Sequence, residues 1–80
     1  MMNQTVPATI TAIERTHSRV EVRLTADHHP EKIFTVAADI SVRLPNGHIP
    51  GPGDRVRLTL DGGLPVEIVV DGYQVWKAKK

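Results

Sequence analysis

The chain has 80 residues and no cysteine, and its ten basic and nine acidic residues give a formal net charge of +1. This length accommodates one small domain over residues 1–80, and the lack of cysteine excludes disulfide bonds, thiolate metal sites and cysteine nucleophiles. Because 40% of the residues are hydrophobic and 24% are charged, the composition is typical of a folded domain rather than a disordered chain.

The N-terminal residues 1–7 hold neither a basic region nor an apolar run, so we expect no signal peptide. No apolar stretch approaches the ~20 residues that a membrane helix needs. We therefore expect a cytoplasmic location and no membrane partner.

Three segments in the first half alternate between apolar and polar residues, with the period of two that is typical of strands. The first covers residues 6–14 and is rich in β-branched residues. In the second, residues 19–25, the apolar side chains point to one face while Arg19 and Arg23 point to the other. We expect a third strand over residues 32–38.

Residues 39–53 have a different composition, with half of the prolines and half of the glycines of the chain. Proline removes a backbone donor and glycine loses entropy on ordering, so this segment cannot sustain a strand ladder or a long helix. A mobile binding loop and an ordinary connection around a barrel are equally compatible with this composition.

Alternation returns in the second half. Residues 54–60 and 65–70 are expected strands, and residues 73–77 form a third, shorter one. The intervening Asp71-Gly72 is a strong hairpin signal, because both central positions of a type I′ turn need a positive φ.

Short strands joined by tight turns, with one longer connection, predict an all-β fold. We expect a small five- or six-stranded antiparallel barrel, because closure protects the edges of so small a sheet. Three strands, a long connection and two further strands favour an OB-like barrel, with an SH3-like barrel as the alternative.

Residues with metal or catalytic chemistry form no complete motif. Asp27, His28 and His29 are adjacent, but a closed metal site needs about four converging ligands, and His17 and His48 lie apart in the sequence. Nucleophile motifs and phosphate-binding glycine motifs are absent. We expect no metal site, no cofactor and no enzymatic activity.

Arginines expected on outer strand faces are the more informative feature. Arg19 and Arg23 share one strand face, and Arg55 and Arg57 share another. Guanidinium groups suit phosphate oxygens and stack on bases. The alternative is a charged outer face on which carboxylates such as Glu21 pair with these arginines across strands.

Aromatic side chains, on which base stacking normally depends, are limited to three. We expect Phe34 in the core of so small a domain. Tyr73 and Trp76 would point to opposite faces of a regular strand, so at most one would serve a given surface.

Three sequence blocks occur in an order similar to that of bacterial translation initiation factor one and, more broadly, of the S1-like OB-fold proteins. These blocks are Arg19-Val20-Glu21-Val22, Val36-Ala37-Ala38-Asp39-Ile40-Ser41 and Pro52-Gly53-Asp54-Arg55-Val56. The resemblance covers roughly residues 8–60. It implies a five-stranded OB barrel that binds RNA on the ribosome or single-stranded nucleic acid, with Arg43 and Arg55 at basic positions of the family. The chain departs from the family in residues 44–52, where His48 is the only basic side chain, and after Leu60.

These observations predict an OB-like module that binds single-stranded nucleic acid, with RNA favoured over DNA, mainly by neutralising phosphates. The expected binding residues are Arg19, Arg23, Arg43, Arg55 and Arg57. The alternative, of comparable weight, is a protein-interaction module or small subunit of a larger assembly, which would use the Pro/Gly-rich segment or an exposed strand edge.

Overall fold

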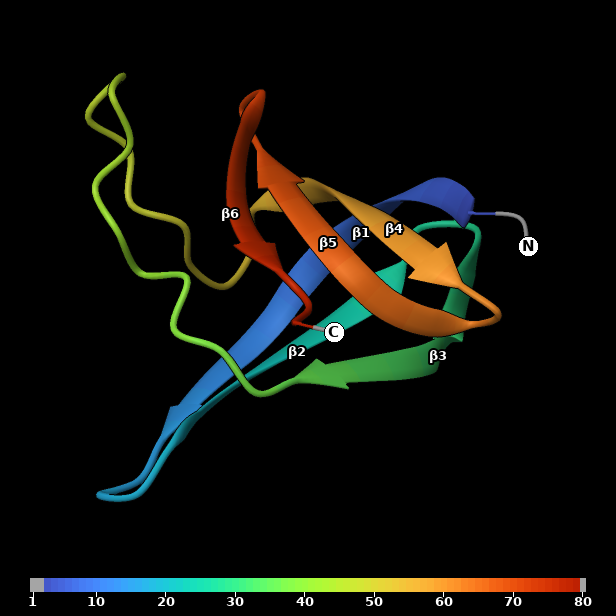
Figure 1. The fold of residues 1–80 in the computed structure, drawn as a ribbon, viewed down its shortest axis with the longest axis horizontal. Helices are drawn as coiled ribbons and strands as arrows, with labels where there is room; N and C mark the ends of the chain where they lie inside the picture. Colours follow the sequence, from blue (N-terminus) through green and yellow to red (C-terminus); the bar gives the residue numbers. More distant parts are fainter. Residues whose placement is uncertain (1–2, 80) are drawn as a thin grey trace.

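The computed structural model describes residues 3–79 and contains a six-stranded antiparallel sheet with the strand order β3-β2-β1-β4-β5-β6 (Figure 1). The strands are β1 (Asn3–Arg15), β2 (Val20–Ala26), β3 (His29–Val36), β4 (Arg55–Asp61), β5 (Leu64–Val70) and β6 (Tyr73–Lys77). No helix occurs in this part of the chain, and so none that could cross a membrane. The all-β, OB-like fold predicted from the alternation is confirmed, with three strands rather than two after the long connection.

Strand β1 is the longest strand and the centre of the sheet. Its first half pairs with β4, from Asn3 opposite Asp61 to Thr9 opposite Arg55, and its second half pairs with β2. The register with β2 shifts between Ile10 and Ala12, and such a bulge bends and twists a strand. Figure 1 shows the result: β1 runs across the barrel and then extends with β2 as a projecting arm.

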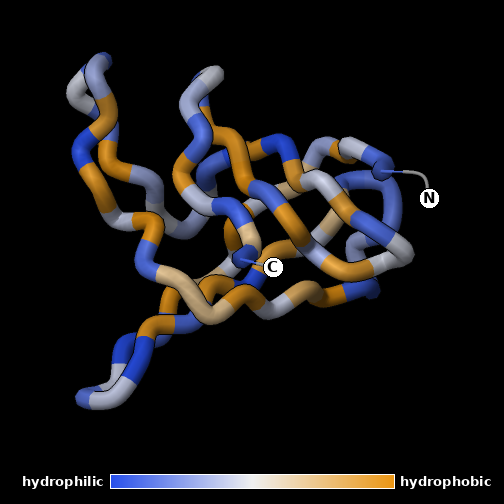
Figure 2. Tube along the Cα trace, in the orientation of Figure 1, coloured by the Kyte–Doolittle hydropathy of each residue, from blue (hydrophilic) through white to orange (hydrophobic). Residues whose placement is uncertain are grey.

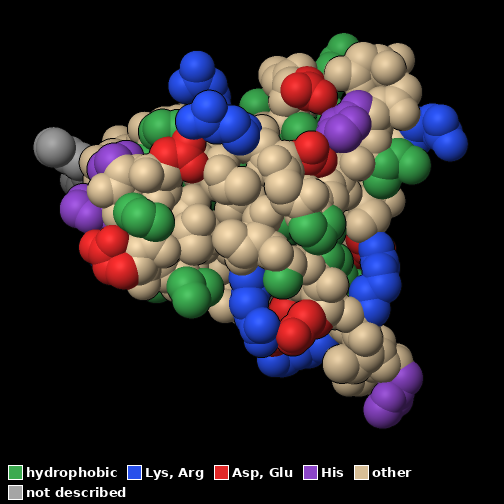
Figure 3. Space-filling model, turned by 180° about the vertical axis from the view of Figure 1, so that it is seen from behind, with side chains coloured by type: hydrophobic (Ala, Val, Ile, Leu, Met, Phe, Trp, Pro, Cys, Tyr) green, Lys and Arg blue, Asp and Glu red, His purple; other side chains and the backbone are tan. Residues whose placement is uncertain are grey.

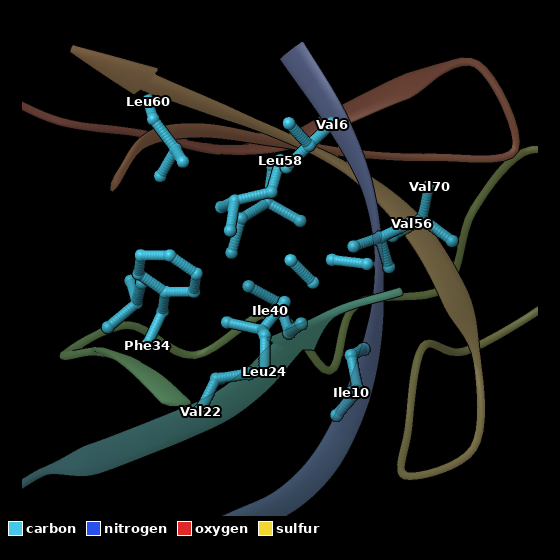
Figure 4. Packing of buried hydrophobic residues seen from close by; sticks show 14 of the residues in the cluster. Val6, Ile10, Val22, Leu24, Phe34, Ile40, Val56, Leu58, Leu60 and Val70 are labelled. Atoms are coloured by element: carbon cyan, nitrogen blue, oxygen red, sulfur yellow. The ribbon is translucent and has the colours of Figure 1, made fainter. Parts of the chain in front are cut away.

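Hydrophobic and hydrophilic residues alternate along the strands (Figure 2), and this alternation sets which side chains are buried in the core. Val22 and Leu24 of β2 are fully buried, as is Leu58 of β4. Phe34 of β3 is 8% exposed and belongs to the same cluster, which confirms its expected place in the core. Figure 4 shows these side chains converging inside the barrel with Val6 and Ile10 of β1.

Residues 37–54 join β3 to β4 without forming a strand or a helix. Nevertheless Ile40 is fully buried, Leu44 is 5% exposed and Pro50 is among the largest fully buried side chains. Strands β3 and β6 are the outer strands of the sheet and do not pair with each other. The apolar side chains of this connection therefore complete a core that the strands alone leave uncovered.

The bounds of β3 differ from the prediction, because the strand runs from His29 to Val36 instead of from residue 32 to residue 38. Pro30 lies within it, which an outer strand tolerates because one of its edges needs no ladder donor. The predicted Asp71-Gly72 turn is confirmed: both residues have a positive φ, of 53° and 83°, as a type I′ turn requires.

Candidate functional site

Arg55 and Arg57 lie on the outer face of β4, one on each side of the buried Val56. Both are exposed, as the alternation predicts. Arg55 Nη2 lies 2.5 Å from Asp27 Oδ2, and Thr9 Oγ1 donates to the other carboxylate oxygen of Asp27 at 2.9 Å. The hydrogen bond from Arg55, followed by that from Thr9, lowers the pKa of Asp27, and the same contact raises the pKa of Arg55.

Arg19 and Arg23 are also engaged by carboxylates. Arg23 on β2 makes a bidentate pair with Glu14 on β1, at 3.1 and 3.0 Å. Arg19 contacts Glu21 and lies in the turn before β2. Three of the five arginines expected to bind nucleic acid are thus paired within the protein. This is the alternative arrangement given above, in which carboxylates on the outer face pair with the arginines.

The side chains of Arg43 and Arg57 make no hydrogen bond or ion pair with residues 3–79. Arg43 lies in the 37–54 connection and Arg57 on β4, so they belong to different parts of the fold. On the face shown in Figure 3, basic and acidic side chains are interspersed, and no broad patch of one sign appears. The face shown in Figure 3 therefore has no single basic stripe.

Arg15 forms a contact that sequence reasoning missed. Its guanidinium donates to both carboxylate oxygens of Asp39 at 3.3 Å and to Ser41 Oγ at 2.6 Å. The hydrogen bonds from Arg15 to Asp39, followed by one from the backbone N–H of Ser41, lower the pKa of Asp39. The pairing joins the end of β1 to the start of the 37–54 connection. No local pattern signals it, because 24 positions separate Arg15 from Asp39.

His28 and His29 are adjacent, whereas His48 lies in the 37–54 connection. The rings of His28 and His29 lie 5.0 Å apart, centroid to centroid, and His29 Nδ1 is 3.6 Å from Glu31 Oε2. In the described part of the chain, no three His, Asp or Glu side chains are placed to hold a metal ion. His48 Nε2 lies 2.8 Å from Asp54 Oδ2, which also accepts from the backbone N–H of Gly51 at 2.7 Å.

Two strand edges are left free by the sheet topology. Strand β3 pairs only with β2, and β6 pairs only with β5. Beyond β6, the backbone N–H of Ala78 still donates to Val66 at 2.8 Å. Among residues 3–79, no further backbone hydrogen bond involves residues 73–77 on the side away from β5.

The outer face also contains a hollow where β1, β4 and β5 meet the turn before β6. The residues that line it are Pro7, Arg55, Val56, Arg57, Val69, Asp71 and Gly72. A second hollow, bounded by Asp61, Glu67, Lys77 and Lys79 among others, has mixed charges.

Comparison with known proteins adds a family assignment. The family model for the TOBE domain, an OB-fold module, matches residues 2–63. No curated protein and no solved structure matches the chain. The match supports the OB-like fold implied by the resemblance to initiation factor one, and it does not extend to that family or to the S1-like proteins specifically. The matched residues are well over half of the 80-residue chain, and the chain therefore belongs to the TOBE domain family.

Proposed function

We propose that this TOBE domain is a protein-interaction module of a larger assembly, and that it binds an extended segment of a partner protein along the free edge of β6. The observation that carries the proposal is the unpaired β6 edge, whose backbone groups are available to a further strand. In this mode of binding, main-chain hydrogen bonds supply affinity and alternate side chains supply specificity.

Strand β6 suits an added strand better than β3 does. Natural sheets protect their edges with proline and charged side chains, and the exposed first half of β3 contains Pro30, Glu31 and Lys32. Strand β6 has the sequence YQVWK, with two aromatic residues, one valine and no proline. These residue types favour strand pairing, so the less protected edge is that of β6.

The distribution of charge also favours a protein partner. Four arginines are paired with carboxylates of the domain itself: Arg15, Arg19, Arg23 and Arg55. Several large apolar side chains are exposed instead, among them Val42 and Ile49 in the 37–54 connection and Tyr73 at the start of β6. The Nδ2 group of Asn46 donates to Asp71 at 3.2 Å, which holds this connection near the turn that precedes β6.

The first test is affinity purification of the domain from the cell that encodes it, with and without nuclease. The proposal predicts a protein that is retained after nuclease treatment and in high salt. Loss of every co-purifying protein after nuclease treatment would contradict the proposal.

Binding of single-stranded nucleic acid is the second candidate, and Arg57 is the observation that favours it. The arginine is exposed and free of carboxylates within residues 3–79, beside Arg55 on the same face. Exposed ion pairs contribute only about 0–1 kcal/mol, so a phosphate can compete for Arg55 as well. Neutralisation of two phosphates on an unstructured RNA predicts a slope of about −1.4 in log K against log salt.

Two double variants test this candidate. The first combines Arg55→Ala with Arg57→Ala, and the second, which is the control, combines Arg19→Ala with Arg23→Ala. The first pair should remove the salt dependence of RNA binding and the second should leave it. If neither RNA nor single-stranded DNA binds at low salt, where electrostatic attraction is least screened, the nucleic-acid candidate is excluded.

A further inference from the structure

The hollow on the outer face contains an arginine whose cross-strand neighbours are apolar. Arg57 on β4 is in register with Pro7 on β1 and with Val69 on β5, and all three line the hollow. On a sheet face, directly opposite residues are the ones that interact. The two positions that would normally hold a carboxylate for Arg57 therefore hold apolar side chains.

On one side of Arg57, the neighbouring row of polar side chains across β4 and β1 has its hydrogen-bonding groups paired within the protein. Arg55 and Thr9, in register on β4 and β1, both donate to Asp27. Arg55 thus already has a carboxylate partner, and Asp27 has two donors.

The row on the other side is satisfied as well, by a chain of hydrogen bonds across four strands. Thr5 contacts Thr59 at 3.1 Å, Thr59 donates to Glu67 at 3.2 Å, and Gln74 donates to the other oxygen of Glu67 at 2.6 Å. Glu67 lies two residues from Val69, and it makes no ion pair with Arg57. Between these two rows, Arg57 is the arginine left without a carboxylate partner in the described part of this face.

Asp71 is the one carboxylate that lines the hollow. Its Oδ2 accepts from Asn46 Nδ2 at 3.2 Å, and it lies beyond ion-pair distance of Arg57. The lining contains the guanidinium groups of Arg55 and Arg57 and the carboxylate of Asp71, but Arg55 is already paired with Asp27. Arg57 is therefore the guanidinium of the lining that is left for an incoming anion.

We propose that the hollow binds a carboxylate attached to an apolar group, with the Arg57 guanidinium on the carboxylate and with Pro7 and Val69 against the apolar part. The planar guanidinium fork matches a carboxylate in a bidentate geometry. A free organic acid and the C-terminal carboxylate of a protein offer the same chemistry. The site is separate from the β6 edge, and it does not depend on the function proposed above.

The test uses hexanoate as the probe, titrated at low salt into the ¹⁵N-labelled protein, with the neutral hexanamide as its match. Hexanoate should shift the amide signals of Arg57 and Gly72 in a saturable way, whereas hexanamide should not. Because a hydrogen bond to a charged group contributes about 1.5–3 kcal/mol, Arg57→Gln should weaken hexanoate binding by about tenfold or more. Arg43→Gln, at the other arginine without a carboxylate, should leave binding unchanged.

Asp71→Asn gives a test of opposite sign. Asparagine tolerates the positive φ of this position and keeps an oxygen acceptor for Asn46. Removal of a like charge from the lining should tighten hexanoate binding by roughly threefold at low salt, the size of a Coulomb interaction through water. A merely structural role for Arg57 would not produce this gain.

A short peptide that ends in leucine, with its C-terminal amide as control, distinguishes the two sources of the carboxylate. Tighter binding of the acid peptide than of hexanoate identifies a protein C-terminus, and the reverse identifies a free organic acid. Equal binding of hexanoate and hexanamide, hexanoate binding unaffected by Arg57→Gln, or no binding of either acid would overturn the proposal. Preference for inorganic phosphate over hexanoate would also overturn it.

Discussion

Asp27 and Arg55 are 28 positions apart in the sequence, and their side chains meet at 2.5 Å across β1. The contact joins the turn after β2 to the first residue of β4. The backbone adds to it, because the N–H of Asp27 donates to the carbonyl of Pro7 on β1 at 3.0 Å. A residue that the sequence offers as a ligand for phosphate is thus also a partner in the assembly of the barrel.

Replacement of Arg55 by Gln should raise the pKa of Asp27 toward its ordinary value of 3.8, because Arg55 is the largest cause of the lowering. Thr9 remains as a donor, so part of the lowering should persist. NMR titration of the Asp27 carboxyl carbon measures this directly. Arg57→Gln, on the same face without a carboxylate, is the control and should leave the Asp27 pKa unchanged. An unchanged pKa in Arg55→Gln would show that the ion pair does not persist in solution.

The same contact sets a direction for the pH dependence of stability. The folded pKa of Asp27 lies below its unfolded value, so its contribution is present above the unfolded pKa and is lost as the pH falls through the folded pKa. Denaturant unfolding between pH 6 and pH 2 should therefore show a smaller acid-induced loss in Arg55→Gln than in the parent protein. An equal loss in both proteins would contradict the linkage.

Replacement of Ile40 by Ala tests whether the 37–54 connection belongs to the core. Ile40 is fully buried, and truncation of such a residue costs about 2–5 kcal/mol of unfolding free energy. Val42→Ala, two residues along and 48% exposed, should cost less than about 0.5 kcal/mol. Similar small losses for both variants in urea unfolding would mean that the connection does not pack as described.

Replacement of His28 and His29 together by Ala should change the free energy of unfolding by less than about 0.5 kcal/mol, as is usual for exposed positions. The expectation rests on the exposure of both side chains; His29 Nδ1 lies 3.6 Å from Glu31 Oε2. Thermal melts with and without zinc should coincide. A zinc-dependent rise in Tm that disappears in the double variant would reveal a metal site.

Much of the fold could be predicted because period-two alternation reports directly on which face of a strand is buried. Val22 and Leu24 on β2, and Val56 and Leu58 on β4, lie in the core as the pattern indicated. The Asp71-Gly72 turn followed from the requirement for a positive φ at both positions. These features are local, so one sequence suffices to find them.

Features that depend on the closed shape were not accessible in this way. Ile40 and Leu44 have no periodic context, and only the packing shows that they fill the open side of the barrel. The arginines were correctly expected on the surface, but their carboxylate partners come from other strands and turns. Arg15 and Asp39 illustrate the difficulty, because neither belongs to a recognisable motif and 24 positions separate them.

The most direct test of the proposed function is photo-crosslinking at the β6 edge. The bond from Ala78 to Val66 makes these two residues a hydrogen-bonded pair, so the preceding Lys77 directs its N–H toward the free edge. Lys77→Pro removes that donor, whereas Lys77→Ala removes only the side chain. Tyr73 on β6 is 39% exposed and is the position for p-benzoylphenylalanine. Leu64, the first residue of β5 and 70% exposed, is the control position.

In the cell that encodes the domain, we expect a nuclease-resistant protein crosslink from position 73 and none from position 64. The crosslink from position 73 should persist in Lys77→Ala and disappear in Lys77→Pro. Far-UV circular dichroism should show that both variants are folded. A crosslink from position 73 that survives in folded Lys77→Pro, or no protein crosslink from position 73 at all, would contradict binding of a partner strand at β6.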